Sequence, residues 1–145
     1  MKKIALALGL LGFTVLANAA DPLNGTVWKT IDDKTKQPKA IVKFTEQKNG
    51  SLSASIQNIL TVGEENACKK CEGPYHNKSL NGLRIVQGLQ NAGGNSYENG
   101  TILDPQSGKT YKLKGQIVEG GKKLELRGFI GVSVLGRNQV WIRAN

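Results

Sequence analysis

The sequence predicts an all-β fold, a small antiparallel up-and-down barrel of about eight strands. Three observations predict it: short stretches of alternating apolar and polar residues recur along the chain, turn-forming sequences separate them, and no stretch has the period of a long helix. Such alternation is typical of strands with one buried and one solvated face. A two-layer sandwich also fits the pattern. Eight short strands can close around a filled interior or a small ligand cavity, which favours the barrel.

The N-terminus has the features of a secretory signal peptide, residues 1–19. Two lysines precede an apolar run over residues 4–16, and a small-x-small site for signal peptidase ends at Ala19. Cleavage there would leave residues 20–145 as a single β-barrel domain, periplasmic or secreted. The apolar run is too short for a stable spanning helix and no second one follows, so we predict no transmembrane segment.

The chain is basic, with a formal net charge of +9, of which +7 remains when the two N-terminal lysines are removed. A basic exported protein is attracted to anionic surfaces such as lipid head groups and acidic glycans. Many of the lysines alternate with apolar residues, however, as on the solvated face of a sheet. The lysines are dispersed and aromatic residues are few, so no nucleic acid partner is predicted. Nothing in the sequence indicates an oligomeric state.

The first part of the chain contains three predicted strands. They occupy residues 25–31, 39–46 and 51–59. Asn49-Gly50, between the second and the third, is the strongest short signal for a hairpin. The segment that follows, residues 61–82, has no sustained period and is predicted to be a long loop with room for a short helix near residues 62–68.

The second part of the chain contains five predicted strands. They occupy residues 83–89, 97–103, 109–118, 123–130 and 138–144. Residues 90–96 are rich in Gly and Asn and are predicted to be a turn. Three glycines lie within strands, where we expect the closing sheet to bend or bulge: Gly88, Gly115 and Gly128.

Cys68 and Cys71 are predicted to form a disulfide, since two neighbouring cysteines pair in an oxidising compartment. The bridge closes a short loop, so its stabilisation is on the order of 2 kcal/mol, and its role would be to fix the long loop over one barrel end. The alternative is a thiol–disulfide redox protein that uses this pair, with flanking lysines favouring the thiolate. Gly73-Pro74 then follows at the point where a redox motif continues into a helix.

We find no catalytic constellation and predict a non-enzymatic protein without a metal or a cofactor. His76 is the single histidine, and with the two cysteines it gives too few ligands for a closed zinc site. The acidic residues lie mostly in turn sequences, which explains them without catalysis. The spacing of Gly131 and Gly136 copies a phosphate-binding loop but lacks the Lys-Ser/Thr pair that follows it.

The chain resembles the exported bacterial family known as domain of unknown function 2147. Four motifs carry the resemblance: Gly25-x-x-Trp28-Lys-x-x-Asp32, Cys68-x-x-Cys71-x-Gly73, Gly100-x-Ile102-x-Asp104-Pro105-x-x-Gly108-Lys109-x-Tyr111, and Arg127-Gly128-Phe129-Ile130-Gly131-x-x-x-x-Gly136-Arg137-x-Gln139-x-Trp141-x-Arg143. The resemblance implies a periplasmic, lipocalin-like barrel with no agreed activity. In such barrels a first-strand tryptophan packs against a last-strand arginine, which implies that Trp28 pairs with Arg143 or Arg137.

The predicted function is binding of a small apolar or amphiphilic ligand, or of an anionic envelope component, at the barrel end covered by residues 61–82. The alternative remains redox chemistry at the cysteine pair. Seven residues are candidates for the ligand site or the barrel ends: Trp28, Tyr97, Tyr111, Arg127, Arg137, Trp141 and Arg143.

Overall fold

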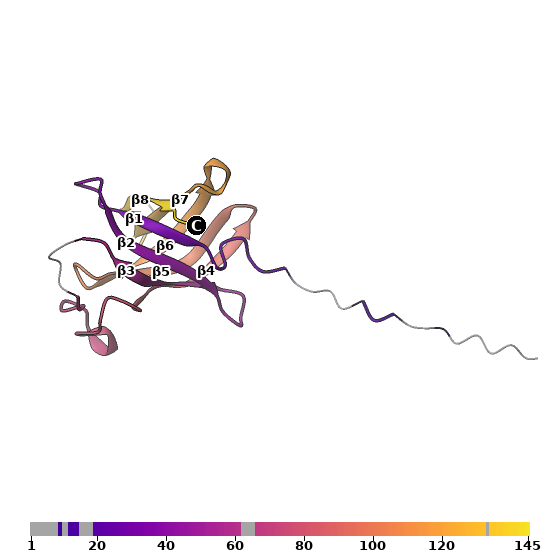
Figure 1. Ribbon diagram of the computed structural model, residues 1–145, viewed down its shortest axis with the longest axis horizontal. Helices are drawn as coiled ribbons and strands as arrows, with labels where there is room; N and C mark the ends of the chain where they lie inside the picture. Colours follow the sequence, from indigo (N-terminus) through magenta and orange to yellow (C-terminus); the bar gives the residue numbers. More distant parts are fainter. Residues whose placement is uncertain (1–8, 10–11, 15–18, 62–65, 133) are drawn as a thin grey trace, which may run out of the picture.

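The computed structural model describes residues 9, 12–14, 19–61, 66–132 and 134–145. Eight antiparallel strands in this part of the chain close into one barrel, in which each strand pairs with the next along the sequence (Figure 1). The predicted all-β, up-and-down barrel is therefore confirmed. The predicted signal peptide lies mostly outside the described residues. Where the structure is described, it has no helix of the length and hydrophobicity needed to cross a bilayer.

The meander closes where β1 (Val27–Ile31) pairs with β8 (Gly136–Arg143), through Trp28 opposite Arg143 and Lys29 opposite Ile142. The strands between them are β2 (Pro38–Glu46), β3 (Leu52–Ile59), β4 (Arg84–Gly93), β5 (Ser96–Asp104), β6 (Lys109–Val118) and β7 (Lys123–Phe129). Two 3₁₀ turns interrupt the described chain, η1 (Gly73–Tyr75) and η2 (Glu119–Gly121). The short helix allowed near residues 62–68 falls mostly outside the described residues.

The hydrophobic core lies inside the barrel, because alternate residues of each strand face inward. In β2, Ala40, Val42 and Phe44 are buried, while Lys43 and Thr45, on the other parity, are exposed. The same period places Leu113 and Ile117 of β6 inside and leaves its lysines in solvent. The lysines that alternate along the strands thus form part of the wet outer face.

The predicted turn over residues 90–96 is wrong in its extent. Strand β4 continues to Gly93 and pairs with β5 through Asn91 opposite Tyr97 and Gly93 opposite Ser96. A register shift between Asn91 and Gly93 absorbs the irregular conformation of this segment, so these two residues remain in the ladder. The chain reverses just beyond it, where Gly94 has a φ of 56°.

The in-strand glycines serve two purposes. Gly88 has a φ of 66° and lies at the register shift between β3 and β4, which is the bulge that its position predicts. Gly115 instead makes room, since a Cβ there would lie 2.6 Å from Leu126 Cδ2. The close approach of β6 and β7 therefore depends on a missing side chain.

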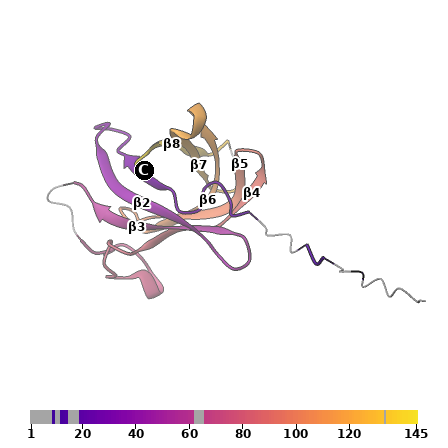
Figure 2. The same cartoon turned by 45° about the vertical axis from the view of Figure 1, so that its right-hand side comes forward.

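Residues 21–26 seal one end of the barrel. Leu23 is fully buried, and the Thr26 hydroxyl donates to the Leu23 carbonyl at 2.6 Å and accepts the indole N–H of Trp28 at 2.7 Å. The Tyr97 hydroxyl donates to the Asp21 carboxylate at 2.7 Å. Burial, together with this carboxylate, raises the pKa of Tyr97 well above its usual range, so the phenol stays protonated. Figures 1 and 2 show this N-terminal segment and the loop of residues 66–80 at different ends of the barrel.

Candidate ligand-binding cavity

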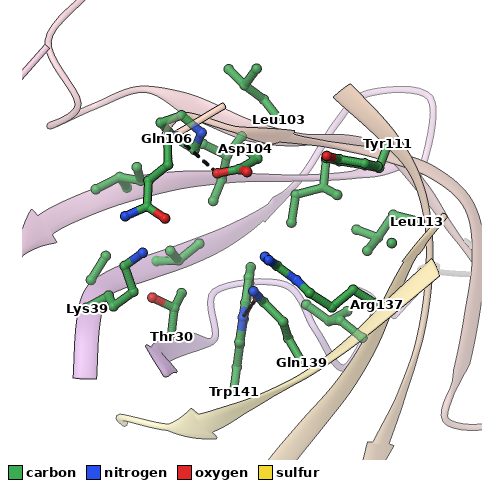
Figure 3. Close-up of a pocket in the computed structure, with 18 of the residues that line it drawn as sticks. Thr30, Lys39, Leu103, Asp104, Gln106, Tyr111, Leu113, Arg137, Gln139 and Trp141 are labelled. Carbon is green, nitrogen blue, oxygen red and sulfur yellow. Dashed lines mark hydrogen bonds between the residues drawn. The ribbon is translucent and has the colours of Figure 1, made fainter. Parts of the chain in front are cut away.

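The end of the barrel opposite the seal opens into an internal cavity of about 720 Å³ (Figure 3). This volume lies within the range of roughly 300–1,000 Å³ that is usual for small-molecule sites. Apolar side chains from seven strands, β2 to β8, form its walls: Ala40, Val42, Ile56, Ile85, Ile102, Leu113, Leu126 and Trp141. The interior of the barrel is therefore only partly filled by side chains.

Strand β8 places side chains at increasing depth in the barrel. Four residues share its inward face: Arg137, Gln139, Trp141 and Arg143. Arg137 lies at the mouth, and Gln139 and Trp141 lie deeper in the cavity. The Trp141 indole N–H donates to Gln139 Oε1 at 3.1 Å, and its ring centroid is 6.2 Å from that of Phe44, which lies beyond the cavity. Trp141 thus marks the inner end of the cavity.

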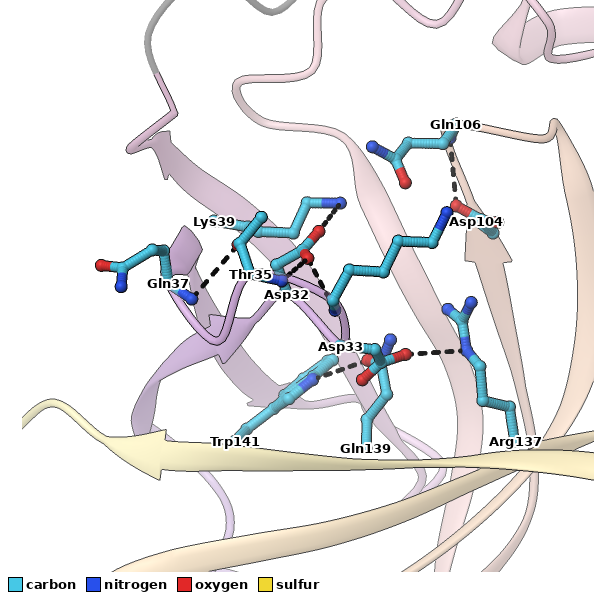
Figure 4. A network of polar contacts seen from close by, with 11 residues as sticks. Asp32, Asp33, Thr35, Gln37, Lys39, Asp104, Gln106, Arg137, Gln139 and Trp141 are labelled. Carbon is cyan, nitrogen blue, oxygen red and sulfur yellow. Dashed lines mark hydrogen bonds and ion pairs between the residues drawn. The ribbon is translucent and has the colours of Figure 1, made fainter.

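Two cations, Lys39 of β2 and Arg137 of β8, lie at the mouth on either side of β1, and each pairs with an aspartate of the β1–β2 loop (Figure 4). Lys39 Nζ is 3.7 Å from Asp32 Oδ2, and Arg137 Nε is 3.1 Å from Asp33 Oδ2. The Arg137 side chain is 67% exposed, so its ion pair is screened by water and contributes little to stability. An incoming anion can therefore compete with Asp33 for this guanidinium.

Asp32 is held in its ionised form by the loop around it. Its Oδ1 accepts the backbone N–H of Thr35 at 2.7 Å and that of Lys34 at 2.8 Å. The hydrogen bond from Thr35 and then the one from Lys34 lower the pKa of Asp32 below its usual value. A lowered pKa means that this carboxylate supports the loop above its ordinary pKa and loses that effect only in more acidic solution.

The loop of residues 66–82 forms one side of the mouth. Its disulfide, Cys68–Cys71, is present as predicted, with the two Cα atoms 5.3 Å apart, and Lys69 and Lys70 between the cysteines line the cavity. The loop rests on the β5–β6 turn, where Gly108 has a φ of 74° and a Cβ would collide with the Lys70 carbonyl oxygen. The absence of a side chain at Gly108 thus allows the loop to pack against the β5–β6 turn.

The redox alternative is not favoured by the surroundings of the cysteines. Cys68 is fully buried and Cys71 is 2% exposed, so an attacking thiolate has no direct access to either sulfur. His76 Nδ1 lies 3.0 Å from the Cys71 carbonyl oxygen, to which it donates, and this contact braces the loop. Among the residues that the structure describes, no three His, Cys, Asp or Glu side chains gather as a metal site would require.

The structure divides the seven predicted residues among three places. Tyr111, Arg137 and Trp141 line the cavity. Trp28, Tyr97 and Arg143 lie at the sealed end. Arg127 lies on the outer face of β7, where its guanidinium donates to Asn138 Oδ1 at 2.8 Å.

The expected tryptophan–arginine contact is made by Arg143. Its guanidinium carbon is 5.3 Å from the centroid of the Trp28 ring, whereas Arg137 lies at the opposite end of the barrel. Most of the cavity lining was missed by sequence reasoning, including the polar residues Lys39 and Gln139. Gln139 could have been found from its parity with Trp141 on β8.

Comparisons with known proteins agree with this architecture. A family model described as an uncharacterized protein conserved in bacteria (DUF2147) matches residues 26–143. The chain is also similar to a solved structure, protein HP1028 from the human pathogen Helicobacter pylori, described as belonging to the lipocalin family. The two share 23% sequence identity with a TM-score of 0.73, over 85% of this chain and 83% of that one. This likeness shows the fold, a lipocalin-like barrel. No curated protein matches the chain.

Proposed function

The chain belongs to this uncharacterized bacterial family, DUF2147, and on that premise we propose that it is a non-enzymatic, exported protein that binds a small anionic amphiphile. The single observation that carries the proposal is the apolar cavity, sealed at one end and open at the other. Export is supported by the signal-peptide features of residues 1–19 and by the disulfide.

The apolar chain of the ligand would lie inside the barrel. Walls of Val, Ile and Leu offer a dry surface without hydrogen-bonding partners. Each methylene that moves from water to such a surface contributes about 0.8 kcal/mol. Eight to ten buried methylenes therefore contribute roughly 6–8 kcal/mol, from which the costs of association are subtracted.

The head of the ligand would lie at the mouth. Lys39 from β2 and Arg137 from β8, the two strands that flank β1, extend toward the cavity (Figure 3). Both donate charge-assisted hydrogen bonds, which favour a carboxylate, sulfonate or phosphate over a neutral group. Because the aspartates that pair with them belong to one loop, a single anionic head can replace both contacts.

We expect hexadecanoate to bind with one-to-one stoichiometry and to displace a fluorescent probe, anilinonaphthalene sulfonate, from the protein. The double variant Lys39→Gln/Arg137→Gln should bind hexadecanoate about tenfold more weakly, a loss of about 1.4 kcal/mol. Its affinity for hexadecanol should stay within about twofold of wild type, since the alcohol has no charge to lose.

The matched control is Lys43→Gln/Arg84→Gln, which removes the same charge from two exposed residues of β2 and β4 outside the cavity. It should bind both compounds as wild type does. Equal losses in the two double variants would mean that only net charge matters, and the proposed head site would be wrong. If neither compound binds wild type, the function itself is wrong.

A further inference from the structure

The largest cluster of exposed apolar side chains in the described structure lies at the rim of the cavity. Ile130, Val132, Val134 and Leu135 are 60%, 62%, 77% and 69% exposed, and all belong to the connection between β7 and β8. We call these four residues the apolar tip. Single exposed apolar residues are ordinary, but a contiguous group marks a surface that contacts something.

The apolar tip is continuous with the mouth of the cavity. Ile130 and Leu135 are among the residues that line the cavity, while Val132 and Val134 are not. A backbone hydrogen bond from Ile130 N to Leu135 O at 3.2 Å joins the two arms of the connection. Whatever covers the tip therefore also lies against the opening through which a ligand enters.

Cations lie directly behind the apolar tip on the outer wall of the barrel. The strand register places Lys112 opposite Phe129, the residue before Ile130, and Lys114 opposite Arg127. Lys112 and Lys114 are both exposed, and Lys114 Nζ lies 5.7 Å from the Phe129 ring centroid. β6 and β7 contain one acidic residue, Glu125. It lies on the same face as Arg127 but two residues further from the tip.

The apolar tip, with the basic collar that Lys112 and Lys114 form behind it, matches the interface of an anionic bilayer. Apolar side chains enter the boundary between head groups and acyl chains, and lysines behind them contact lipid phosphates. A protein partner fits less well, since stable interfaces bury roughly 800 Å² on each side and are enriched in aromatic residues. Four aliphatic side chains at a hairpin tip fall short of that area.

We propose that the apolar tip docks this protein onto anionic lipid bilayers, so that its cavity mouth faces the membrane. This inference rests on the proposed function for the cargo, an amphiphile that would pass between bilayer and barrel without crossing water. Docking itself requires only the tip and its basic collar.

The test is co-sedimentation with vesicles of phosphatidylcholine containing phosphatidylglycerol, and with vesicles of phosphatidylcholine alone. The protein is purified after export from its host and its N-terminus is read by mass spectrometry. Wild type should pellet with the anionic vesicles and much less with the neutral ones. Lys112→Gln/Lys114→Gln should reduce the apparent affinity for the anionic vesicles by roughly 30-fold.

Val132→Ser/Val134→Ser should reduce vesicle binding at least about tenfold, because the apolar area that enters the lipid is lost. The matched control is Val140→Ser, which alters a valine of β8 that is 40% exposed and lies away from the tip. It should sediment as wild type does.

All of these variants should bind anilinonaphthalene sulfonate in solution as wild type does, since none of the changed residues lines the cavity. Unchanged pelleting of Val132→Ser/Val134→Ser would overturn the docking proposal. So would equal pelleting with both kinds of vesicle, or no pelleting with either. In each case, normal binding of anilinonaphthalene sulfonate would mean that the proposed ligand site is still supported.

Discussion

Replacing Trp28 by alanine is expected to lower the free energy of unfolding by about 3–5 kcal/mol, the usual loss when a fully buried tryptophan is truncated. The side chain is 0% exposed and joins the N-terminal segment, residues 21–26, to β8. Its indole N–H reaches Thr26, and its ring lies under the Arg143 guanidinium. Since small domains are stable by about 5–15 kcal/mol, a large share of the stability would be lost.

Urea unfolding followed by circular dichroism measures this effect without relying on tryptophan fluorescence. Arg143→Met keeps the aliphatic stem but removes the charge over the ring, and should lose only about 0.5–2 kcal/mol. If Trp28→Ala loses no more stability than Arg143→Met, Trp28 does not close the barrel as described.

Gly128→Trp is expected to weaken hexadecanoate binding by roughly 60-fold while leaving the barrel folded. Gly128 lines the cavity, and a Cβ added there would meet Tyr111 and Ile102 at 3.6 and 3.7 Å, ordinary contact distances. From that Cβ the indole would extend into the cavity that Gly128 lines. Exclusion of about three methylenes, at about 0.8 kcal/mol each, accounts for the loss.

The matched control is Thr101→Trp, which places the same side chain on the exposed outer wall of β5. It should bind hexadecanoate like wild type. Isothermal titration of both variants, with their unfolding curves, separates a filled cavity from a damaged fold. Wild-type affinity in a folded Gly128→Trp would show that the ligand lies somewhere else.

The strands could be predicted because each depends on local alternation, and the barrel was inferred from their number. Leu113 and Ile117, for example, share a parity that fixes which face of β6 is buried. The extent of β4 could not be predicted, because Asn91 and Gly93 belong to the strand only by virtue of pairing with Tyr97 and Ser96 of β5. The Gly and Asn residues favour a turn there, but pairing with β5 extends the strand to Gly93.

The cavity was harder to predict than the barrel. Whether an interior is filled depends on the summed volumes of side chains from seven strands, including the gap left by Gly128. The cationic pair at the mouth, Lys39 and Arg137, unites two residues almost a hundred positions apart through the closing contact of β1 with β8. The loop of residues 66–82 has no period at all, and its position depends on packing against Gly108.

The central claim, that an amphiphile lies with its chain inside the barrel, is tested most directly by the two tryptophans of the chain. Trp141 lines the inner end of the cavity, and Trp28 lies at the sealed end beyond it. Stearate brominated in mid-chain quenches a tryptophan that it touches. In Trp28→Phe, which keeps only Trp141, quenching should be strong and saturable. In Trp141→Phe it should be weak. Equal quenching of both variants, or none of Trp141 when the stearate is bound, would contradict the account.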